Sequence, residues 1–337
     1  MNSFGKLFKV SLFGESHGVC VGVVVDGCPE GIKIDDHFFD HDLSRRKFET
    51  ICSTAKSNVS NLKSHPGTTE RHEIDIPEIV SGVYKGFTTG APITLLFRNQ
   101  DINPADYAQI DIHPRPGHAD FVAIKKYHGF ADLRGGGHFS GRLTVALTAA
   151  GVIAKEIIKP IQISATLVEA GGSAGIETKV KEAVQQKNSI GGLIACCIKG
   201  LPVGIGDPFF DGLESLISHA VFAIPGIKAI AFGSGFDAAA MKGSEHNDVI
   251  INETGATKTN HAGGINGGIS NGNEIYFRVA IKPTPSIGLP QQTFNFDSKT
   301  METLSIKGRH DACFALRLPP VIEAATAIVL ADLWLQN

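Results

Sequence analysis

The sequence predicts an α+β fold, a β-α-β sandwich with two similar halves in which mixed or antiparallel sheets pack on helices. Three observations support this prediction. β-prone runs and apolar-periodic helical segments are interspersed along the chain. Several strands follow one another through short turns, which argues against a purely parallel, doubly wound sheet. With 337 residues, 42% of them hydrophobic, the chain can bury a sizeable core, and we treat residues 1–337 as a single domain.

The first half of the chain begins with an expected hairpin. Residues 7–13 and 19–25 are β-prone and flank the loop Gly14-Glu15-Ser16-His17-Gly18, which should project polar side chains. Residues 47–73 are rich in Ser, Thr, Asn and Lys and predict a mobile surface segment that could serve as a lid. The next expected elements are strands at 79–83 and 92–97 and a helix at 121–127.

Helical spacing and proline positions predict the later elements. The glycine-rich run 134–142 leads into an apolar-periodic helix over 143–159, which Pro160 ends. A closing helix over 321–335 follows two prolines, and proline is favoured in the first turn of a helix. Between them we expect a helix at 211–224 and strands at 228–232 and 274–282.

Composition excludes several classes of protein. The 31 basic and 34 acidic side chains argue against a disordered chain and a nucleic-acid-binding surface, so local charges must hold any anionic ligand. The six cysteines form no C-x-x-C pair, which indicates reduced thiols. The N-terminus lacks the apolar run of a signal peptide, and Pro225, Lys228 and Asp237 interrupt the apolar stretch 219–241. We therefore expect a soluble, cytoplasmic protein without a membrane partner.

Two segments could hold an anionic ligand. Residues 134–142 place glycine amides, Arg134 and Arg142 at a helix start, where free N–H groups and the helix dipole attract phosphate. The run matches neither the ATP-hydrolysing phosphate loop nor the dinucleotide fingerprint, and a purely structural role for its glycines stays open. The second segment, 282–286, offers a lysine and two hydroxyls on a proline-stiffened loop, or is simply a strand end closed by prolines.

Two of the 13 histidines stand out by context. His17 lies beside Ser16 in a glycine-flanked loop, and His118 follows Arg115 and a proline. An imidazole can donate a proton near neutral pH, and an adjacent arginine would both recruit an anion and favour the neutral ring. Each histidine taken alone could instead serve the fold.

Asp311 is a further candidate, because it follows Arg309 and His310 close to a helix start. It could act as a base, or it could be an ion-paired capping carboxylate. The histidine, cysteine and carboxylate positions lack the spacing of zinc or iron ligands, so no metal site is expected.

Six ordered motifs lead beyond the individual residues. They are Gly14-Glu15-Ser16-His17-Gly18, Arg115-Pro116-Gly117-His118-Ala119-Asp120, Arg134-Gly135-Gly136-Gly137, Asn260-His261-Ala262-Gly263-Gly264-Ile265 with Gly267-Gly268-Ile269, Lys282-Pro283-Thr284, and Gly308-Arg309-His310-Asp311. In this order they strongly resemble the motifs of the chorismate synthase family, and the resemblance runs from about residue 3 to residue 333. The combination is far more specific than any one motif.

The resemblance implies a carbon–oxygen lyase of the shikimate pathway of aromatic amino acid biosynthesis. Such an enzyme converts 5-enolpyruvylshikimate 3-phosphate to chorismate and phosphate by a 1,4-anti elimination. The reaction has no net redox change yet needs reduced FMN, since the hydrogen lost from carbon is weakly acidic and the phosphate is a poor leaving group. The family fold is a β-α-β sandwich assembled as a homotetramer.

The resemblance also implies catalytic roles. His17 would protonate or stabilise the departing phosphate, and Ser16 belongs to the same acid–base set. His118 would keep the reduced flavin correctly protonated at N1, and Asp311 would assist proton removal through flavin N5.

Binding roles follow in the same way. Arg46, Arg115 and Arg142 would clamp the phosphate and carboxylates of the substrate, because guanidinium groups bind these anions in bidentate fashion. The implied flavin contacts are His138, Phe139, Ser140, Pro225, Gly226, Gly267, Lys282, Pro283, Thr284, Pro285, Ser286 and Arg309.

The sequence departs from the family pattern at three places. The family's Arg-Ser-Ser is His138-Phe139-Ser140, and its Asn-Ala is Pro225-Gly226. Its Arg-Arg-Arg-Pro-Gly is Arg45-Arg46-Lys47-Phe48-Glu49, which leaves a second substrate arginine unassigned. Two alternatives therefore stay open: a non-catalytic relative that binds flavin or an anionic metabolite, and another phosphate-eliminating lyase of this fold.

The source of reduced flavin is a further expectation. The chain contains no dinucleotide-binding fingerprint, so we expect it to depend on an external flavin reductase or other supply of reduced flavin. Efficient oxidation of NADPH by the protein itself is not expected.

Overall fold

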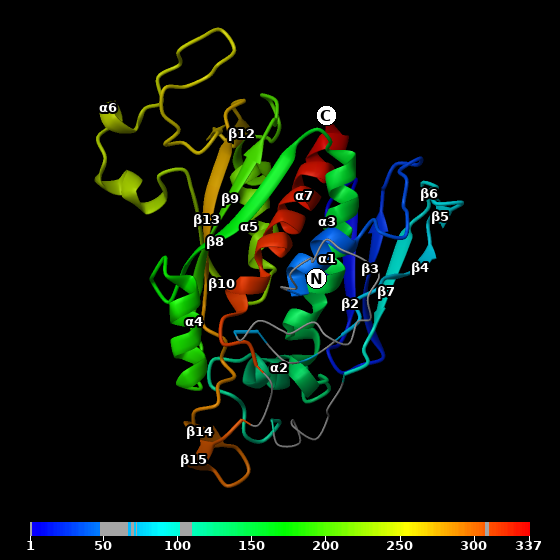
Figure 1. Cartoon of the computed structure of the whole chain (residues 1–337), viewed down its shortest axis with the longest axis vertical. Helices are drawn as coiled ribbons and strands as arrows, with labels where there is room; N and C mark the ends of the chain where they lie inside the picture. The colour runs from blue at the N-terminus through cyan, green and yellow to red at the C-terminus, as the bar shows by residue number, and fades with distance from the viewer. Residues whose placement is uncertain (1, 48–66, 69–70, 72, 102–109, 307–309) are drawn as a thin grey trace.

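The computed structural model describes residues 2–47, 67–68, 71, 73–101, 110–306 and 310–337. Two antiparallel sheets flank a layer of helices (Figure 1), which confirms the predicted α+β sandwich. One sheet has the strand order β1-β2-β3-β7-β4 and the other the order β10-β13-β9-β8. These strands are β1 (Ser3–Phe4), β2 (Lys9–Gly14), β3 (Cys20–Asp26), β4 (Glu78–Ser81), β7 (Ile93–Arg98), β8 (Gln162–Ala170), β9 (Gly192–Lys199), β10 (Ile227–Phe232) and β13 (Ile275–Ile281).

β2 and β3 form the predicted hairpin, and their loop carries Ser16 and His17. The side chains of β3 that face the helices stand directly opposite those of β7, and all of them are at most 1% exposed. The pairs are Val21 with Phe97, Val23 with Leu95 and Val25 with Ile93. Each fully buried aliphatic side chain of this kind contributes about 1.5–3 kcal/mol, so the hairpin is anchored firmly beneath its loop.

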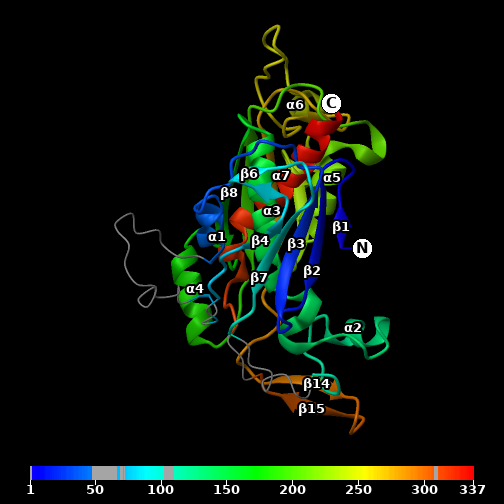
Figure 2. The same ribbon diagram turned by 90° about the vertical axis from the view of Figure 1, so that its right-hand side faces the viewer.

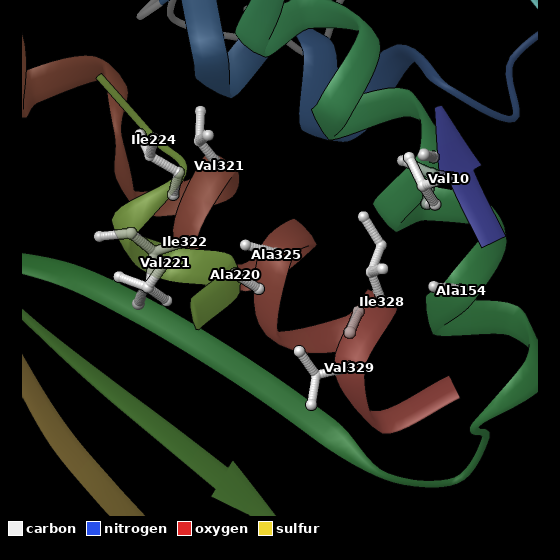
Figure 3. Close-up of a cluster of buried hydrophobic side chains, with 14 of the residues drawn as sticks. Val10, Ala154, Ala220, Val221, Ile224, Val321, Ile322, Ala325, Ile328 and Val329 are labelled. Carbon is white, nitrogen blue, oxygen red and sulfur yellow. The ribbon is translucent and has the colours of Figure 1, made fainter. Parts of the chain in front are cut away.

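The central helices are α3 (Thr144–Ile157) and α7 (Pro319–Gln336), with α5 (Leu213–Phe222) packed beside them. α3 and α7 approach closely, since a Cβ atom on Gly151 would lie 2.2 Å from the Cβ of Ala324. Figure 3 shows the apolar cluster that α7 forms with α5 and its neighbours. Its labelled residues are Val10, Ala154, Ala220, Val221, Ile224, Val321, Ile322, Ala325, Ile328 and Val329.

A buried ion network joins α7 to α1 (Asp40–Lys47) and α3. The Glu323 carboxylate accepts hydrogen bonds from both terminal nitrogens of Arg45, at 2.8 and 2.7 Å, and from Lys155 Nζ at 2.8 Å. It also accepts the backbone N–H of Ala165, and Lys155 bridges to Asp42 at 2.6 Å. The network fixes the orientation of α1. The residue after Arg45, Arg46, contacts Thr144 and Asp75 instead of Glu323.

The smaller elements lie at the two ends of the sandwich. Figure 2 shows α2 and the β14–β15 hairpin near one end and α6 near the other. Their bounds, with those of the remaining short strands and helix α4, are α2 (Asp120–Lys126), α4 (Ile176–Gln185), α6 (Gly243–His246), β5 (Val83–Tyr84), β6 (Phe87–Thr88), β11 (Ile265–Asn266), β12 (Ile269–Ser270), β14 (Gln291–Asn295) and β15 (Thr300–Leu304). Among the residues described above, no helix is long and apolar enough to cross a bilayer.

The helices and strands named in the sequence analysis are all present, with ends shifted by a few residues. Three elements lie in a region for which the sequence patterns above predict nothing, namely β8, α4 and β9. β8 and β9 pair along their length and complete the four-stranded sheet against α7.

Candidate active site

A cavity of about 670 Å³ lies where α3 begins, which is within the usual size range of small-molecule sites. The β2–β3 loop, the end of α1, the glycine-rich run and the 282–286 loop all contribute to its wall. The residues of the sequence analysis that line it are His17, Arg46, Arg115, His118, His138, Phe139, Ser140, Arg142, Pro225, Gly226, Lys282, Pro283, Thr284, Pro285, Ser286 and Asp311.

Three of the candidate residues stand apart from this set. Ser16 is fully buried behind His17 and does not line the cavity. Gly267 lies in the turn between β11 and β12, also outside the lining. Arg309 falls outside the described residues.

His17 is buried, with 6% of its surface exposed, at the tip of the β2–β3 loop. The loop is held from both sides, because Ser16 N–H donates to Gly137 O at 3.1 Å and Arg71 donates to Ser16 Oγ at 2.8 Å. Burial and the positive charges of Arg71 and Arg134 lower the pKa of His17 to about 4. The imidazole is therefore neutral at pH 7 in the ligand-free chain.

The glycine-rich run packs directly against both candidate histidines. A Cβ atom on Gly135 would lie 2.1 Å from His17 Nδ1, and one on Gly136 would lie 3.4 Å from His118 Nε2. Both glycines, and Gly137 after them, have positive φ. The absence of side chains at Gly135 and Gly136 thus lets the backbone approach the two imidazoles. Ser140 caps the start of the following helical turn by accepting the Arg142 N–H at 3.3 Å.

His118 is oriented by a buried carboxylate that the sequence analysis did not single out. Its Nδ1 lies 2.6 Å from Asp120 Oδ1, and Arg115 donates to both oxygens of the same carboxylate, at 2.7 and 2.8 Å. Burial alone would raise the pKa of Asp120, but Arg115 and His118 outweigh it and hold the pKa far below its usual range. The ionised Asp120 favours the tautomer with hydrogen on Nδ1, which leaves Nε2 for the cavity.

We expect Asp120→Asn to lower kcat by about 10- to 100-fold with KM changed little, because a charge-assisted hydrogen bond that positions His118 is lost. Steady-state kinetics on the purified variant measure both constants. Asp211→Asn is the control, since Asp211 pairs with Lys6 at the surface and should behave like the parent. A kcat for Asp120→Asn within twofold of the parent would contradict the assigned positioning role.

Two cavity-lining arginines share one buried counter-ion. Asp75 accepts a hydrogen bond from Arg46 at 3.1 Å through Oδ2 and another from Arg142 through Oδ1. Arg71 binds Glu73 at 2.6 Å, so a second ion pair lies beside the first.

These contacts correct part of the prediction for residues 47–73. That prediction places the whole segment on the surface, but Thr68 is 6% exposed and the Glu73 side chain 5%. Long-range contacts of Glu73 with the Gln100 N–H and with Arg142, which local composition does not reveal, accompany the burial of Glu73. Residues 48–66, 69, 70 and 72 lie outside the described residues, so the expected mobility of the segment stays a prediction.

The 282–286 loop faces the same cavity. Lys282 Nζ donates to Gly117 O at 2.7 Å, and Ser286 Oγ accepts from Arg115 at 3.2 Å. Among the described residues, the buried Thr284 Oγ1 has no hydrogen-bond partner. The loop therefore offers a cation and a hydroxyl to a ligand.

Asp311 completes the wall, with Oδ1 accepting from Arg317 Nε at 3.0 Å. The ring of Phe314 packs next to it against Gly141, where a Cβ atom would lie 2.9 Å from the ring. A carboxylate, two imidazoles and several guanidinium groups thus surround a single cavity, an arrangement suited to proton transfer on an anionic substrate.

The family model of chorismate synthase matches residues 8–335. The chain belongs to the chorismate synthase family. It is 54% identical to the chorismate synthase of Chitinophaga pinensis over 99% of this chain and 97% of that protein. It is 42% identical to the chorismate synthase of Dehalococcoides mccartyi, again over 99% of this chain and 97% of the relative.

A solved structure described as the crystal structure of chorismate synthase has the same fold. It superposes with a TM-score of 0.72 at 24% identity and covers 99% of this chain and 93% of its own. Membership in the chorismate synthase family, with relatives this similar over the whole length, makes the protein a carbon–oxygen lyase of aromatic amino acid biosynthesis.

For this chorismate synthase family member, sequence reasoning missed Arg71, Glu73, Asp75 and Asp120 as site residues. Asp120 stood inside a quoted motif, two residues after His118, and that spacing was an available signal. The alternation of Arg71, Glu73 and Asp75 was also visible, but a polar segment with period-two charge does not by itself tell which face is buried.

Proposed function

We propose that the protein converts 5-enolpyruvylshikimate 3-phosphate to chorismate and phosphate by 1,4-anti elimination, with reduced FMN as cofactor. The observation that carries the proposal is the convergence of two histidines, one aspartate and three arginines on a single cavity of about 670 Å³. They are His17, His118, Asp311, Arg46, Arg115 and Arg142.

The arginines suit the substrate, which carries two carboxylates and a phosphate. Arg46 and Arg142 lie side by side on one wall, joined through Asp75, and Arg115 lies with His118. Bidentate guanidinium groups bind such planar or tetrahedral anions strongly and orient them. The net charge of the whole protein is −3, so this local placement of cations is what supports anion binding.

The residues present fit a flavin. Lys282 and the buried hydroxyl of Thr284 offer donors to an anionic or carbonyl group, and Phe139 adds an aromatic surface to the lining. The departures from the family pattern, His138-Phe139 and Pro225-Gly226, lie in the same wall and leave these donors in place. When bound, reduced flavin lends electron density to the reaction and takes it back, which is chemistry that the side chains cannot supply.

The chain's own groups have distinct roles in this proposal. His17 donates a hydrogen bond to the leaving phosphate, whose negative charge raises the pKa of the imidazole from its low ligand-free value. His118, oriented by Asp120 through Nδ1, would present Nε2 to the flavin and so control its protonation. Asp311, held by Arg317, would assist removal of the proton from carbon.

Anaerobic turnover with dithionite-reduced FMN tests the proposal directly. We expect chorismate and phosphate to appear in equal amounts, and no product to appear with oxidised FMN. Flavin binding without turnover would favour the non-catalytic alternative, and release of phosphate without chorismate would favour another lyase.

The finer parts of the proposal concern the setting of the enzyme. We infer from the family resemblance that the protein is a cytoplasmic homotetramer. It takes reduced flavin from an external reductase, because the sequence contains no dinucleotide fingerprint. Steady anaerobic NADPH consumption coupled to chorismate formation, with FMN and no added reductase, would overturn the last point.

We expect Lys282→Ala to weaken binding of reduced FMN by about 10- to 100-fold, because a charge-assisted contact to an anionic cofactor is lost. We expect the same loss for Arg309→Ala, because Arg309 is another of the flavin contacts that the family resemblance implies. Anaerobic fluorescence titration measures the dissociation constant. Lys199→Ala is a matched control, because Lys199 lies on β9 away from the cavity and pairs with Glu274. Parent-like affinity in Lys282→Ala would remove this loop from the cofactor site.

A further inference from the structure

Residues 73–76 lie beside the cavity with their acidic side chains buried and their apolar side chains exposed, the reverse of an ordinary surface segment. The side chains of Glu73 and Asp75 are 5% and 2% exposed, whereas Ile74 and Ile76 are 52% and 73% exposed. Asp75 also has a φ of 55°, which residues with a side chain rarely adopt. Ion pairs, and not burial of apolar surface, therefore hold this segment in place.

Asp75 makes the central contact. One carboxylate oxygen binds Arg46 and the other binds Arg142, so a single anion with two oxygens bridges two guanidinium groups. Burial by itself would raise the pKa of Asp75, but the two arginines outweigh it, and the carboxyl stays ionised near neutral pH.

Neutral groups hold both guanidinium groups independently of Asp75. Arg46 Nε donates to Thr144 Oγ1 at 2.9 Å, and Arg142 Nε donates to Asn99 Oδ1 at 3.0 Å. The two arginines thus keep an orientation toward the cavity when their counter-ion is removed. Glu73 Oε2 also lies 4.0 Å from Arg142, beyond hydrogen-bond distance, so Asp75 is the carboxylate that bonds directly to both guanidinium groups. A ligand can bridge the two arginines only after Asp75 has left them.

We propose that Asp75 is an internal counter-ion that the substrate replaces, and that it thereby determines specificity for polyanions. The inference rests on the proposed function in taking Arg46 and Arg142 as the substrate clamp. A carboxylate or phosphate group with two oxygens takes over the bridge between the arginines, and Asp75 moves to solvent. An anion with a single charge, such as acetate, gains too little to displace Asp75. Phosphate carries more charge and can displace it at high concentration, and a ligand with further anionic groups is also held elsewhere in the cavity.

The test uses inorganic phosphate as the probe and the full chain without flavin or substrate, measured by isothermal titration. We expect Asp75→Asn to bind phosphate at least about tenfold more tightly than the parent, because no counter-ion has to leave. The ratio of the dissociation constants for acetate and phosphate should be smaller in the same variant than in the parent. Glu78→Gln is the control, since Glu78 pairs with Arg98 at an exposed site, and it should match the parent. Unchanged or weaker phosphate binding in Asp75→Asn would overturn the proposal.

A second measurement on the parent protein covers the case in which Asp75→Asn fails to fold. Saturating phosphate should speed hydrogen exchange at the amides of residues 74–76, because the segment loses its ion pairs. Slowed or unchanged exchange would show that Asp75 stays on the arginines and would contradict the exchange of partners. Neither readout requires turnover, so failure of the chorismate assay and failure of this inference are distinguishable.

Discussion

Replacement of His17 by alanine should lower kcat by about 10²- to 10⁴-fold while the fold persists, which is the usual contribution of a positioned acid–base group. His17 sits at a loop tip against glycine backbone, and its ring carries no part of the apolar core. Anaerobic assays with reduced FMN give kcat, and circular dichroism reports the fold. His118→Ala should lose activity to a similar extent.

Two outcomes would contradict this assignment. If His17→Ala unfolds, the imidazole serves the loop and not the reaction. If both histidine variants turn over normally, proton transfer during the elimination depends on other groups. His219→Ala provides a control. His219 lies on α5, packs edge-on against Phe4 of β1 and does not line the cavity of the candidate site.

Removal of the Glu323 side chain should cost about 1.5–3 kcal/mol of folding free energy, because Glu323→Ala removes the buried acceptor shared by Arg45, Lys155 and the Ala165 N–H, while Asp42 still pairs with both cations. Urea unfolding at pH 7 measures the loss. Glu156→Ala on α3 is the matched control, since its pair with exposed Lys159 should contribute at most about 1 kcal/mol. A loss of less than about 1 kcal/mol for Glu323→Ala would mean that the network adds little stability.

The same network predicts how stability depends on pH. Burial would raise the pKa values of Glu323 and Asp42, but the bound cations outweigh it and lower them from their ordinary 4.5 and 3.8. A lowered pKa in the folded state stabilises the protein above the ordinary value, and that contribution is lost as the pH falls through the folded value. The free energy of unfolding should therefore begin to decrease as the pH falls below about 4.5. Glu323→Ala should make the free energy of unfolding depend less steeply on pH in this range.

Local pattern accounted for the elements whose environment is set by nearby residues. The β2–β3 hairpin follows from alternating valines and a glycine-bounded loop, and α7 from two prolines followed by a predominantly apolar run. β8 was missed because its exposed and half-buried residues alternate weakly, and its pairing with β9 depends on residues about 30 positions away. Periodicity alone gives little information about such a strand.

The site divides in the same way. The motifs and the family resemblance pointed to His17, His118, Asp311 and three arginines, and the structure places these residues around one cavity. The bridge from Asp75 to Arg46 and Arg142 was beyond prediction, because it joins residues far apart in the chain through charge alone. The sequence left open whether the glycines bind phosphate or serve the fold, and their contact with the imidazoles emerged only from the packing.

That packing couples the positions of the two histidine rings. Because His17 rests on Gly135 and His118 on Gly136, neighbouring backbone positions constrain the placement of both rings. A nucleotide change that adds a side chain at Gly135 would push one imidazole away and displace the backbone against the other. A single substitution at Gly135 should therefore disturb both rings at once, although the new side chain would touch only one of them.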